Sequence, residues 1–175
     1  MVNQPEHNGV NSTSPLILTL GINGEAQQYF DDLRRRYFPP ERNYLKAHLT
    51  LFHLLPDEPG IYDDLNEMAD KQPIFSLYAE RIVSIGKGTA IRIKSQELMS
   101  LHRALQERWL GFLNAQDKQK LWPHVTIQNK VSPDRARELQ ALLNVGFKPF
   151  RFRASGFRLW RYLDGPWEEL SFLKF

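Results

Sequence analysis

Two kinds of hydrophobic pattern alternate along the chain. Apolar runs rich in β-branched residues, or alternating with polar residues, predict strands at 16–22, 46–55, 74–86, 89–94, 121–131, 150–163 and 167–175. Apolar residues three or four positions apart predict helices at 25–37, 61–71, 95–113 and 133–146. Proline and glycine separate most of these elements, as turns require. The pattern predicts a mixed α+β protein.

The order strand, helix, strand, helix, strand occurs twice, which indicates an internal repeat. One offset of 76 positions relates the matching pairs His48 and His124, Thr50 and Thr126, and Pro73 and Pro149. A single repeat of this length is not a solenoid. We expect one domain over 16–175, with equivalent halves at roughly 16–88 and 89–175 and a ligand site where they meet. The alternative is a chance coincidence of a common α+β rhythm.

Each half carries the pattern His-apolar-Thr-apolar, at 48–51 and at 124–127. In a strand, residues i and i+2 point to the same face, so each His shares a face with its Thr. The intervening apolar residues point to the other face and anchor the strand. Each strand therefore presents a proton carrier beside a neutral hydroxyl donor.

Two such strands suit an in-line displacement at phosphorus. One imidazole removes a proton from the attacking oxygen while the other protonates the leaving oxygen. The Thr hydroxyls donate to the non-bridging oxygens, where negative charge is held. This scheme needs no metal or other cofactor. The alternative is that both histidines are hydrogen-bonded core residues on buried strands.

The paired motifs in a duplicated α+β chain resemble the 2H (two-histidine) phosphoesterase superfamily, and within it the bacterial 2′-5′ RNA ligase-like proteins. The resemblance implies two pseudo-symmetric lobes, each an antiparallel sheet with helices on its outer face, around a central cleft. It implies action on 2′,3′-cyclic phosphate or 2′-5′ phosphodiester ends of RNA, or on small nucleotides with a cyclic phosphate. It assigns His48 and His124 as the acid/base pair and Thr50 and Thr126 as phosphate donors.

One feature departs from that family. Many of its members have an arginine soon after the second motif, whereas here the run is Gln128-Asn129-Lys130. Lys130 supplies a point charge without the two-pronged hydrogen bonding of arginine.

Residues of even number on the two motif strands are expected to share the catalytic face. Four of them are candidate substrate-binding residues, as cations for phosphate or aromatic rings for a base: Lys46, Phe52, Trp122 and Lys130. The alternative is rim packing and solvated charge. His53 has the opposite parity and is expected to face the core or the strand end. The run 34–36 of three arginines is expected to be a solvated helix end, with an RNA contact as the alternative.

Composition excludes several classes of protein. The 175 residues contain no cysteine, which excludes a disulfide scaffold, a thiol nucleophile and a cysteine-ligated metal. A net charge of +3 tolerates an anionic ligand but is far from that of a polybasic binder. Residues 1–15 are polar and predict a flexible N-terminal tail without a secretory signal. No run of about 18 apolar residues predicts a membrane span.

We therefore expect a cytoplasmic, monomeric, metal-independent phosphodiesterase whose partners are RNA ends or small nucleotides, with no membrane. A non-catalytic module that binds phosphorylated RNA ends, and a purely structural repeat protein, are the alternatives.

Overall fold

The computed structural model describes residues 14–175, so the predicted tail lies outside the described residues except for Ser14 and Pro15. The elements follow the predicted order: β1 (Leu16–Ile22), α1 (Gly24–Tyr37), β2 (Leu49–Leu55), α2 (Pro59–Lys71), β3 (Phe75–Ser84), β4 (Thr89–Lys94), α3 (Gln96–Trp109), β5 (His124–Gln128), α4 (Pro133–Gly146), β6 (Phe150–Tyr162) and β7 (Trp167–Lys174). A short 3-10 helix, Pro40–Arg42, follows α1.

The two motif strands are shorter than predicted. β2 begins at Leu49, and β5 spans only His124–Gln128. Pro123 precedes β5 and has no N–H to donate to a neighbouring strand. Beyond the strand, Lys130 has a φ of 59°, a left-handed conformation in which an extended strand cannot continue.

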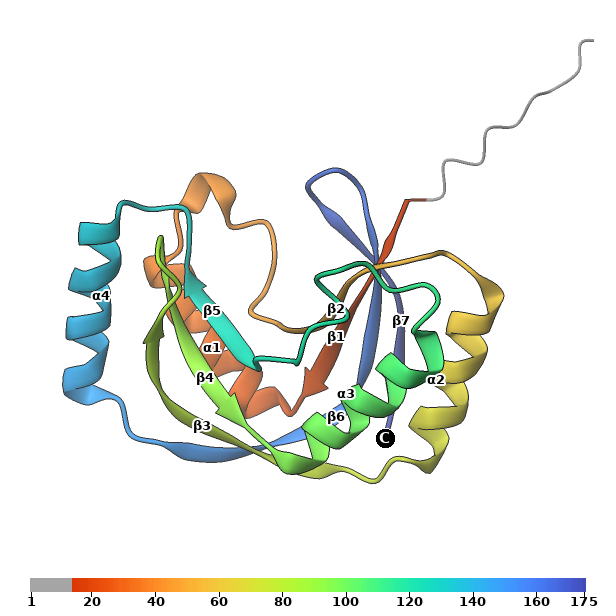
Figure 1. The fold of residues 1–175 in the computed structure, drawn as a ribbon. Coiled ribbons are helices and arrows are strands. Elements are labelled where there is room, and N and C mark those ends of the chain that lie inside the picture. Colours follow the sequence, from red (N-terminus) through yellow and green to blue (C-terminus); the bar gives the residue numbers. More distant parts are fainter. Residues whose placement is uncertain (1–13) are drawn as a thin grey trace, which may run out of the picture.

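The strands form one curled antiparallel sheet in the order β2-β1-β6-β3-β4-β5, and β7 pairs with β6 beside this path (Figure 1). β6 has 13 residues and pairs with β3 over 150–154, then with β1 on one edge and β7 on the other. The α+β class with antiparallel strands is confirmed. The expectation of a separate sheet in each lobe is wrong. The structure has one continuous sheet, because β6 is long enough to pair with strands of both lobes.

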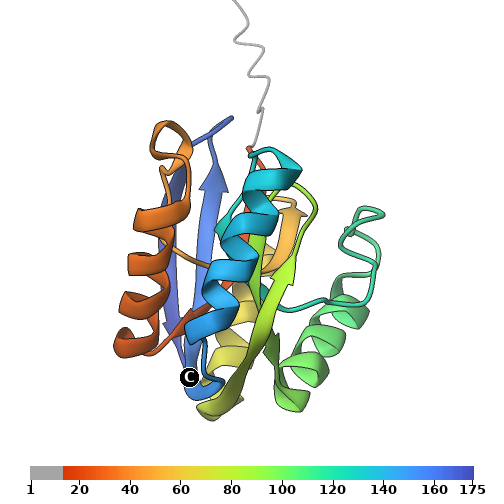
Figure 2. The same ribbon diagram turned by 90° about the vertical axis from the view of Figure 1, so that its left-hand side faces the viewer.

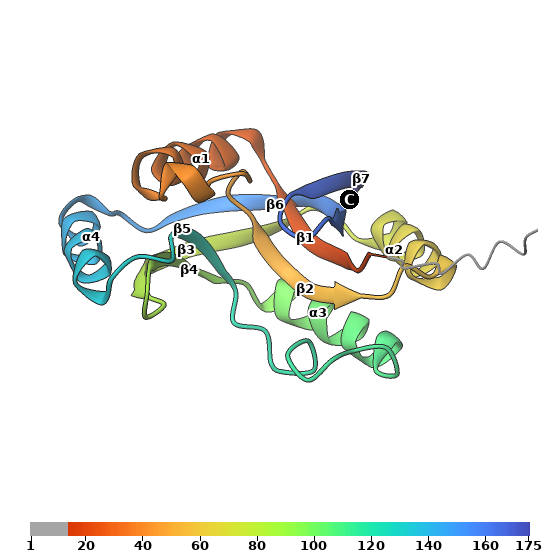
Figure 3. The same ribbon diagram turned by 90° about the horizontal axis from the view of Figure 1, so that it is seen from above.

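We name the two parts of the sheet by their outer strands. The β2 half comprises β1, β2, β7 and the C-terminal part of β6, and the β5 half comprises β3, β4, β5 and the N-terminal part of β6. Seen from above, α1 and α4 lie along the β5 half while α2 and α3 lie along the β2 half (Figure 3). Figure 2 shows α1 and α4 side by side on the outside of the β5 half.

The helices after β1 and β4 cross over between the halves. α1 follows β1 but packs on the β5 half, where the ring of Phe30 meets those of Phe150 and Phe152. α3 follows β4 but packs on the β2 half, where the ring of His102 stacks on Phe52. Each half of the sequence thus contributes one helix to the other half of the sheet, which a repeat read along the chain does not reveal.

Local sequence accounts for where the elements begin and turn. The hydroxyls of Ser95 and Ser132 accept hydrogen bonds from the backbone N–H groups of Leu98 and Arg135, capping α3 and α4. In the turn between β3 and β4, a side chain at Gly88 would collide with the backbone of Gln128, so only glycine allows β4 to lie against β5 there. None of the helices described here is both long and apolar enough to cross a membrane.

Candidate active site

The two His-x-Thr motifs lie on the strands that end the sheet path. The curl of the sheet brings β2 and β5 close to each other. Thr50 of the first motif and His124 of the second line one pocket of about 150 Å³. His48 lines a larger pocket of about 310 Å³ with Lys46 and Trp167. Thr126 is half-buried on β5. Segments far apart in the sequence thus contribute to one region of the surface.

The two imidazoles are held in the same way. Nδ1 of His48 lies 2.8 Å from the carbonyl oxygen of Lys46, and Nδ1 of His124 lies 2.8 Å from that of Trp122. A carbonyl oxygen only accepts, so Nδ1 of each neutral ring carries the proton and Nε2 carries the lone pair. Each Nε2 is therefore a proton acceptor when the ring is neutral and a donor when it is charged.

An indole ring flanks each imidazole. The ring centres of His48 and Trp167, and those of His124 and Trp122, are each 4.8 Å apart. Trp122 is also 4.9 Å from the guanidinium of Arg92. These contacts restrict the rotation of both imidazoles, which favours a pre-set geometry for proton transfer.

Burial makes both histidines weak bases. Burial lowers the pKa of His48 to about 4, against the opposing effect of the Lys46 carbonyl and with help from the charge of Arg34 and the other imidazoles. Burial also lowers the pKa of His124, although the Trp122 carbonyl opposes the shift. Both rings are therefore neutral at pH 7 until an anion stabilises their charged form.

This depressed pKa predicts acid sensitivity of the fold. In the unfolded chain His48 regains its ordinary pKa of 6.5 and takes up a proton that the folded protein refuses down to about pH 4. The contribution of His48 to stability is complete above pH 6.5 and is lost as the pH falls from there toward 4. Urea unfolding at pH 7, 5.5 and 4.5 should show a smaller loss in His48→Asn than in the wild type. Parallel losses in the two proteins would contradict the burial of a neutral imidazole.

Arg34 ties the two motifs together from α1. Its side chain is 5% exposed, and Nη1 donates to the carbonyl of Thr126 at 3.0 Å. Nε lies 2.9 Å from Oδ1 of Asn43 and 3.0 Å from the carbonyl of Leu45, in the segment that leads to His48. The expectation that Arg34 lies on a solvated helix end is wrong, because α1 packs against β5 rather than ending in solvent.

Two more residues of α1 hold the same segment. The carboxylate of Asp31 accepts from the backbone N–H of Ala47 at 2.7 Å, and Nε2 of Gln27 donates to the Ala47 carbonyl at 2.8 Å. Together with Arg34, these bonds fix the backbone just before His48 relative to β5. The crossing of α1 to the β5 half therefore sets the position of both motifs.

Comparison of the sequence with known protein families identifies the family of this chain. The profile of the 2′-5′ RNA ligase superfamily matches residues 23–166, which include both motifs. The chain belongs to this superfamily. That result confirms the resemblance inferred from the paired motifs, while no curated protein sequence matches the chain significantly.

Several solved structures share the fold of this chain. The TT0787 structure of Thermus thermophilus aligns with a TM-score of 0.64 and 17% identity, covering 91% of this chain and 97% of that one. The Escherichia coli LigT structure complexed with 3′-AMP aligns with a TM-score of 0.59 and 18% identity, covering 92% and 97%. Usb1 of Kluyveromyces marxianus aligns with a TM-score of 0.51 and 12% identity, covering 94% and 99%.

The four predicted substrate-binding residues have different positions. Lys46 lines the larger pocket with His48, and Trp122 lines the smaller one with His124. Lys130 is exposed beyond the end of β5 and lines neither of these pockets. Phe52 is fully buried and stacks on His102 of α3, so the prediction that it faces substrate is wrong.

A β-bulge in β2 explains the position of Phe52. Thr50 pairs with Thr19 of β1, but the next residue of β1, Leu18, pairs with Phe52. Leu51 is therefore an extra residue, and both Leu51 and Phe52 are buried. Just beyond the bulge the alternation is reversed, so His53 is exposed where Phe52 was expected to be.

His53 is the residue that the period-two argument misses. The expectation that it faces the core is wrong, because its side chain is 48% exposed and lines the pocket that contains Thr50 and His124. The sequence signal is the adjacent apolar pair Leu51-Phe52, which breaks the alternation of the strand and is typical of a bulge. Within residues 14–175, no cluster of three or more His, Asp or Glu side chains is arranged to hold a metal ion.

Proposed function

We propose that this protein is a metal-independent phosphodiesterase acting on 2′,3′-cyclic phosphate or 2′-5′ phosphodiester ends of RNA. The observation that carries the proposal is the matched pair of imidazoles, His48 and His124, each with Nδ1 bonded to a carbonyl and Nε2 left for proton transfer. Membership of the 2′-5′ RNA ligase superfamily supports it. So does the likeness in fold to LigT, a structure of which was solved with 3′-AMP.

The proposed hydrolysis is an in-line displacement. Nε2 of one histidine takes a proton from water as the water oxygen bonds to phosphorus, and the opposite P–O bond of the cyclic ester breaks. The other histidine, protonated at Nε2, gives its proton to the departing ribose oxygen, which leaves a phosphomonoester. The hydroxyls of Thr50 and Thr126 donate to the non-bridging oxygens as their charge increases.

Substrate binding lets one imidazole take up from solvent the proton that this cycle needs. Both imidazoles are neutral in the free protein at pH 7, because burial lowers the pKa of each. A phosphate anion between them favours the charged form of one ring and raises its pKa toward the working pH. One of the two imidazoles thus becomes protonated, as the cycle requires, when the anionic substrate binds.

The larger pocket offers a place for the nucleoside. Trp167 and Trp160 line it beside His48, with ring centres 6.0 Å apart, and Lys46 lies at the same pocket. Nε1 of Trp160 donates to Oγ1 of Thr19 at 2.9 Å, which fixes that indole. A base stacked on such an aromatic surface gains binding energy with little dependence on sequence.

A substrate screen tests the proposal. Purified protein should hydrolyse a 2′,3′-cyclic mononucleotide or a 2′-5′-linked dinucleotide, with the same rate before and after treatment with EDTA. Product analysis by chromatography distinguishes the outcomes. Binding without product would indicate a non-catalytic module, and loss of activity with EDTA that returns with added metal would indicate a metal-dependent hydrolase.

A further inference from the structure

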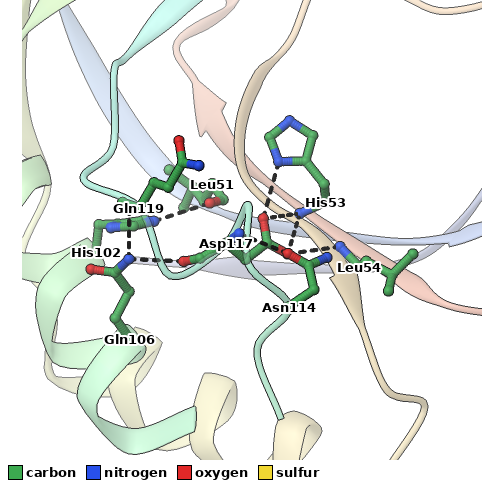
Figure 4. Close-up of polar contacts among 8 residues, drawn as sticks. All are labelled: Leu51, His53, Leu54, His102, Gln106, Asn114, Asp117 and Gln119. Atoms are coloured by element: carbon green, nitrogen blue, oxygen red, sulfur yellow. Dashed lines mark hydrogen bonds and ion pairs between the residues drawn. The ribbon is translucent and has the colours of Figure 1, made fainter. Parts of the chain in front are cut away.

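His53 belongs to a polar cluster that joins β2 to the loop after α3 (Figure 4). Nδ1 of His53 lies 3.1 Å from Oδ1 of Asp117, whose side chain is 1% exposed. The same carboxylate accepts from the backbone N–H groups of His53 and Leu54 at 2.9 to 3.0 Å. Asp117 therefore fixes both the backbone and the ring of His53.

The loop that carries Asp117 is itself held in place. Nε2 of Gln106 on α3 donates to the carbonyls of Asp117 and Gln119, each at 2.8 Å. The backbone N–H of Asp117 donates to Oδ1 of Asn114 at 2.8 Å. These bonds lower the freedom of the loop, so the carboxylate is a rigid support for the imidazole.

The free edge of the His53 ring is available to a ligand. Because Asp117 occupies Nδ1, Nε2 lies on the side of the ring away from the carboxylate (Figure 4). The ring lines the pocket of about 150 Å³ that also contains Thr50 and His124. Lys120 lies at the same pocket, and among residues 14–175 it has no salt-bridge partner.

The charges around this pocket favour an anion. Apart from Asp117, the residues that line it are either apolar or neutral hydrogen-bonding groups, namely imidazoles, an indole, a hydroxyl and two amides, together with one lysine, Lys120. The one acidic group, Asp117, is buried and already accepts hydrogen bonds from three N–H groups, counting two backbone groups and the ring. An anion bound here meets hydrogen-bond donors and positive charge without an exposed carboxylate to repel it.

His53 has no counterpart in the second half of the repeat. The offset of 76 that superposes the catalytic pairs places Asn129 opposite His53. Oδ1 of Asn129 accepts from the backbone N–H of Lys130 at 2.8 Å, a local turn contact. The paired His and Thr side chains, one set from each half, suit contacts with the reacting phosphate between them. His53 occurs in one half alone, so it suits a contact with the part of the substrate attached to one side of that phosphate.

We propose that His53 and Lys120 form a subsite for a second phosphate of the substrate, next to the phosphate that reacts, and that Asp117 is the positioning residue of this subsite. The inference rests on the proposed function, since it places the reacting phosphate between the two motifs. It assigns the substrate to nucleotides with a further phosphate, such as an RNA end longer than one nucleotide or a phosphorylated mononucleotide.

Binding measurements test the subsite without requiring turnover. Isothermal titration at low salt compares adenosine 3′-monophosphate with adenosine 3′,5′-bisphosphate as ligands. The wild type should bind the bisphosphate about tenfold or more tightly, which corresponds to about 1.4 kcal/mol. His53→Gln and Lys120→Gln should each lose most of that preference and retain the affinity for the monophosphate. Lys118→Gln, an exposed lysine of the same loop outside the pocket, is the matched control and should behave as the wild type.

Two results would overturn the subsite. Equal affinities of the wild type for the two ligands would show that no second phosphate is bound. An equal loss of affinity for both ligands in His53→Gln, with an unchanged melting temperature, would place His53 on the reacting phosphate instead. Hydrolysis of 2′,3′-cyclic AMP is measured in parallel, so that a bisphosphate preference without turnover contradicts the proposed catalysis while leaving the subsite intact.

Discussion

Replacing either His48 or His124 with alanine is expected to lower kcat/KM for a 2′,3′-cyclic nucleotide by about 10³-fold. Each substitution removes the group that occupies its side of the proposed displacement, one as proton acceptor and the other as donor. Because the two rings act in the same step, the double variant should be little slower than the slower single variant. Initial rates on the cyclic nucleotide, with product quantified by chromatography, give the comparison.

Folding must be separated from chemistry in these variants. Circular dichroism and the melting temperature report whether the fold persists, and the affinity for 3′-AMP reports whether the cleft does. Thr50→Val and Thr126→Val, which keep the shape of the side chain, should cost less than the histidine substitutions because each removes one neutral hydrogen bond. Wild-type activity in either histidine variant would refute the assignment of the acid/base pair.

Replacing Arg34 with alanine is expected to lower the free energy of unfolding by about 3 kcal/mol. The substitution leaves the carbonyls of Thr126 and Leu45 without their buried donor and removes a guanidinium that lies 3.8 Å from the ring centre of Phe38. The same loss frees the segment before His48 from β5. A shift of that segment by about 1 Å is enough to reduce kcat/KM by about 100-fold, so activity should fall in the folded fraction as well.

Arg35 on the same helix provides the matched control. Its side chain is 69% exposed and, within residues 14–175, forms a salt bridge with Asp32 alone, at 2.9 Å on the surface. Surface pairs of this kind contribute little, so Arg35→Ala should change the free energy of unfolding by less than about 0.5 kcal/mol. Urea unfolding curves of the two variants give the comparison. An equally small decrease in the free energy of unfolding in both variants would contradict the idea that the buried hydrogen bonds of Arg34 join α1 to the motifs.

Local pattern is sufficient for the elements and for the two motifs. Period-two and period-3.6 signals identify the strands and helices, and the spacing of His48 from His124 reveals the repeat. Lys46 and Trp122 lie in the two pockets because the parity argument holds up to Thr50 and around His124. These features depend on neighbours within a few positions, which sequence reports directly.

Features that depend on non-local packing are not predictable in the same way. The bulge at Leu51 reverses the face of the strand, which buries Phe52 and exposes His53. The burial of Arg34 depends on α1 packing against a strand about 90 positions away, a partner that no local period identifies. A one-residue insertion and one helix crossing thus account for the errors in the predicted site.

The single long strand β6 has a mechanical consequence. Opening the molecule at this strand would require β6 to bend near Ala154, which pairs with Phe75 of β3 on one side and with Ile22 of β1 on the other. Pairing on both sides resists such a bend, so the continuous sheet favours a constant distance between His48 and His124. For the proposed phosphodiesterase, this predicts a cleft of the same width before and after a nucleotide binds.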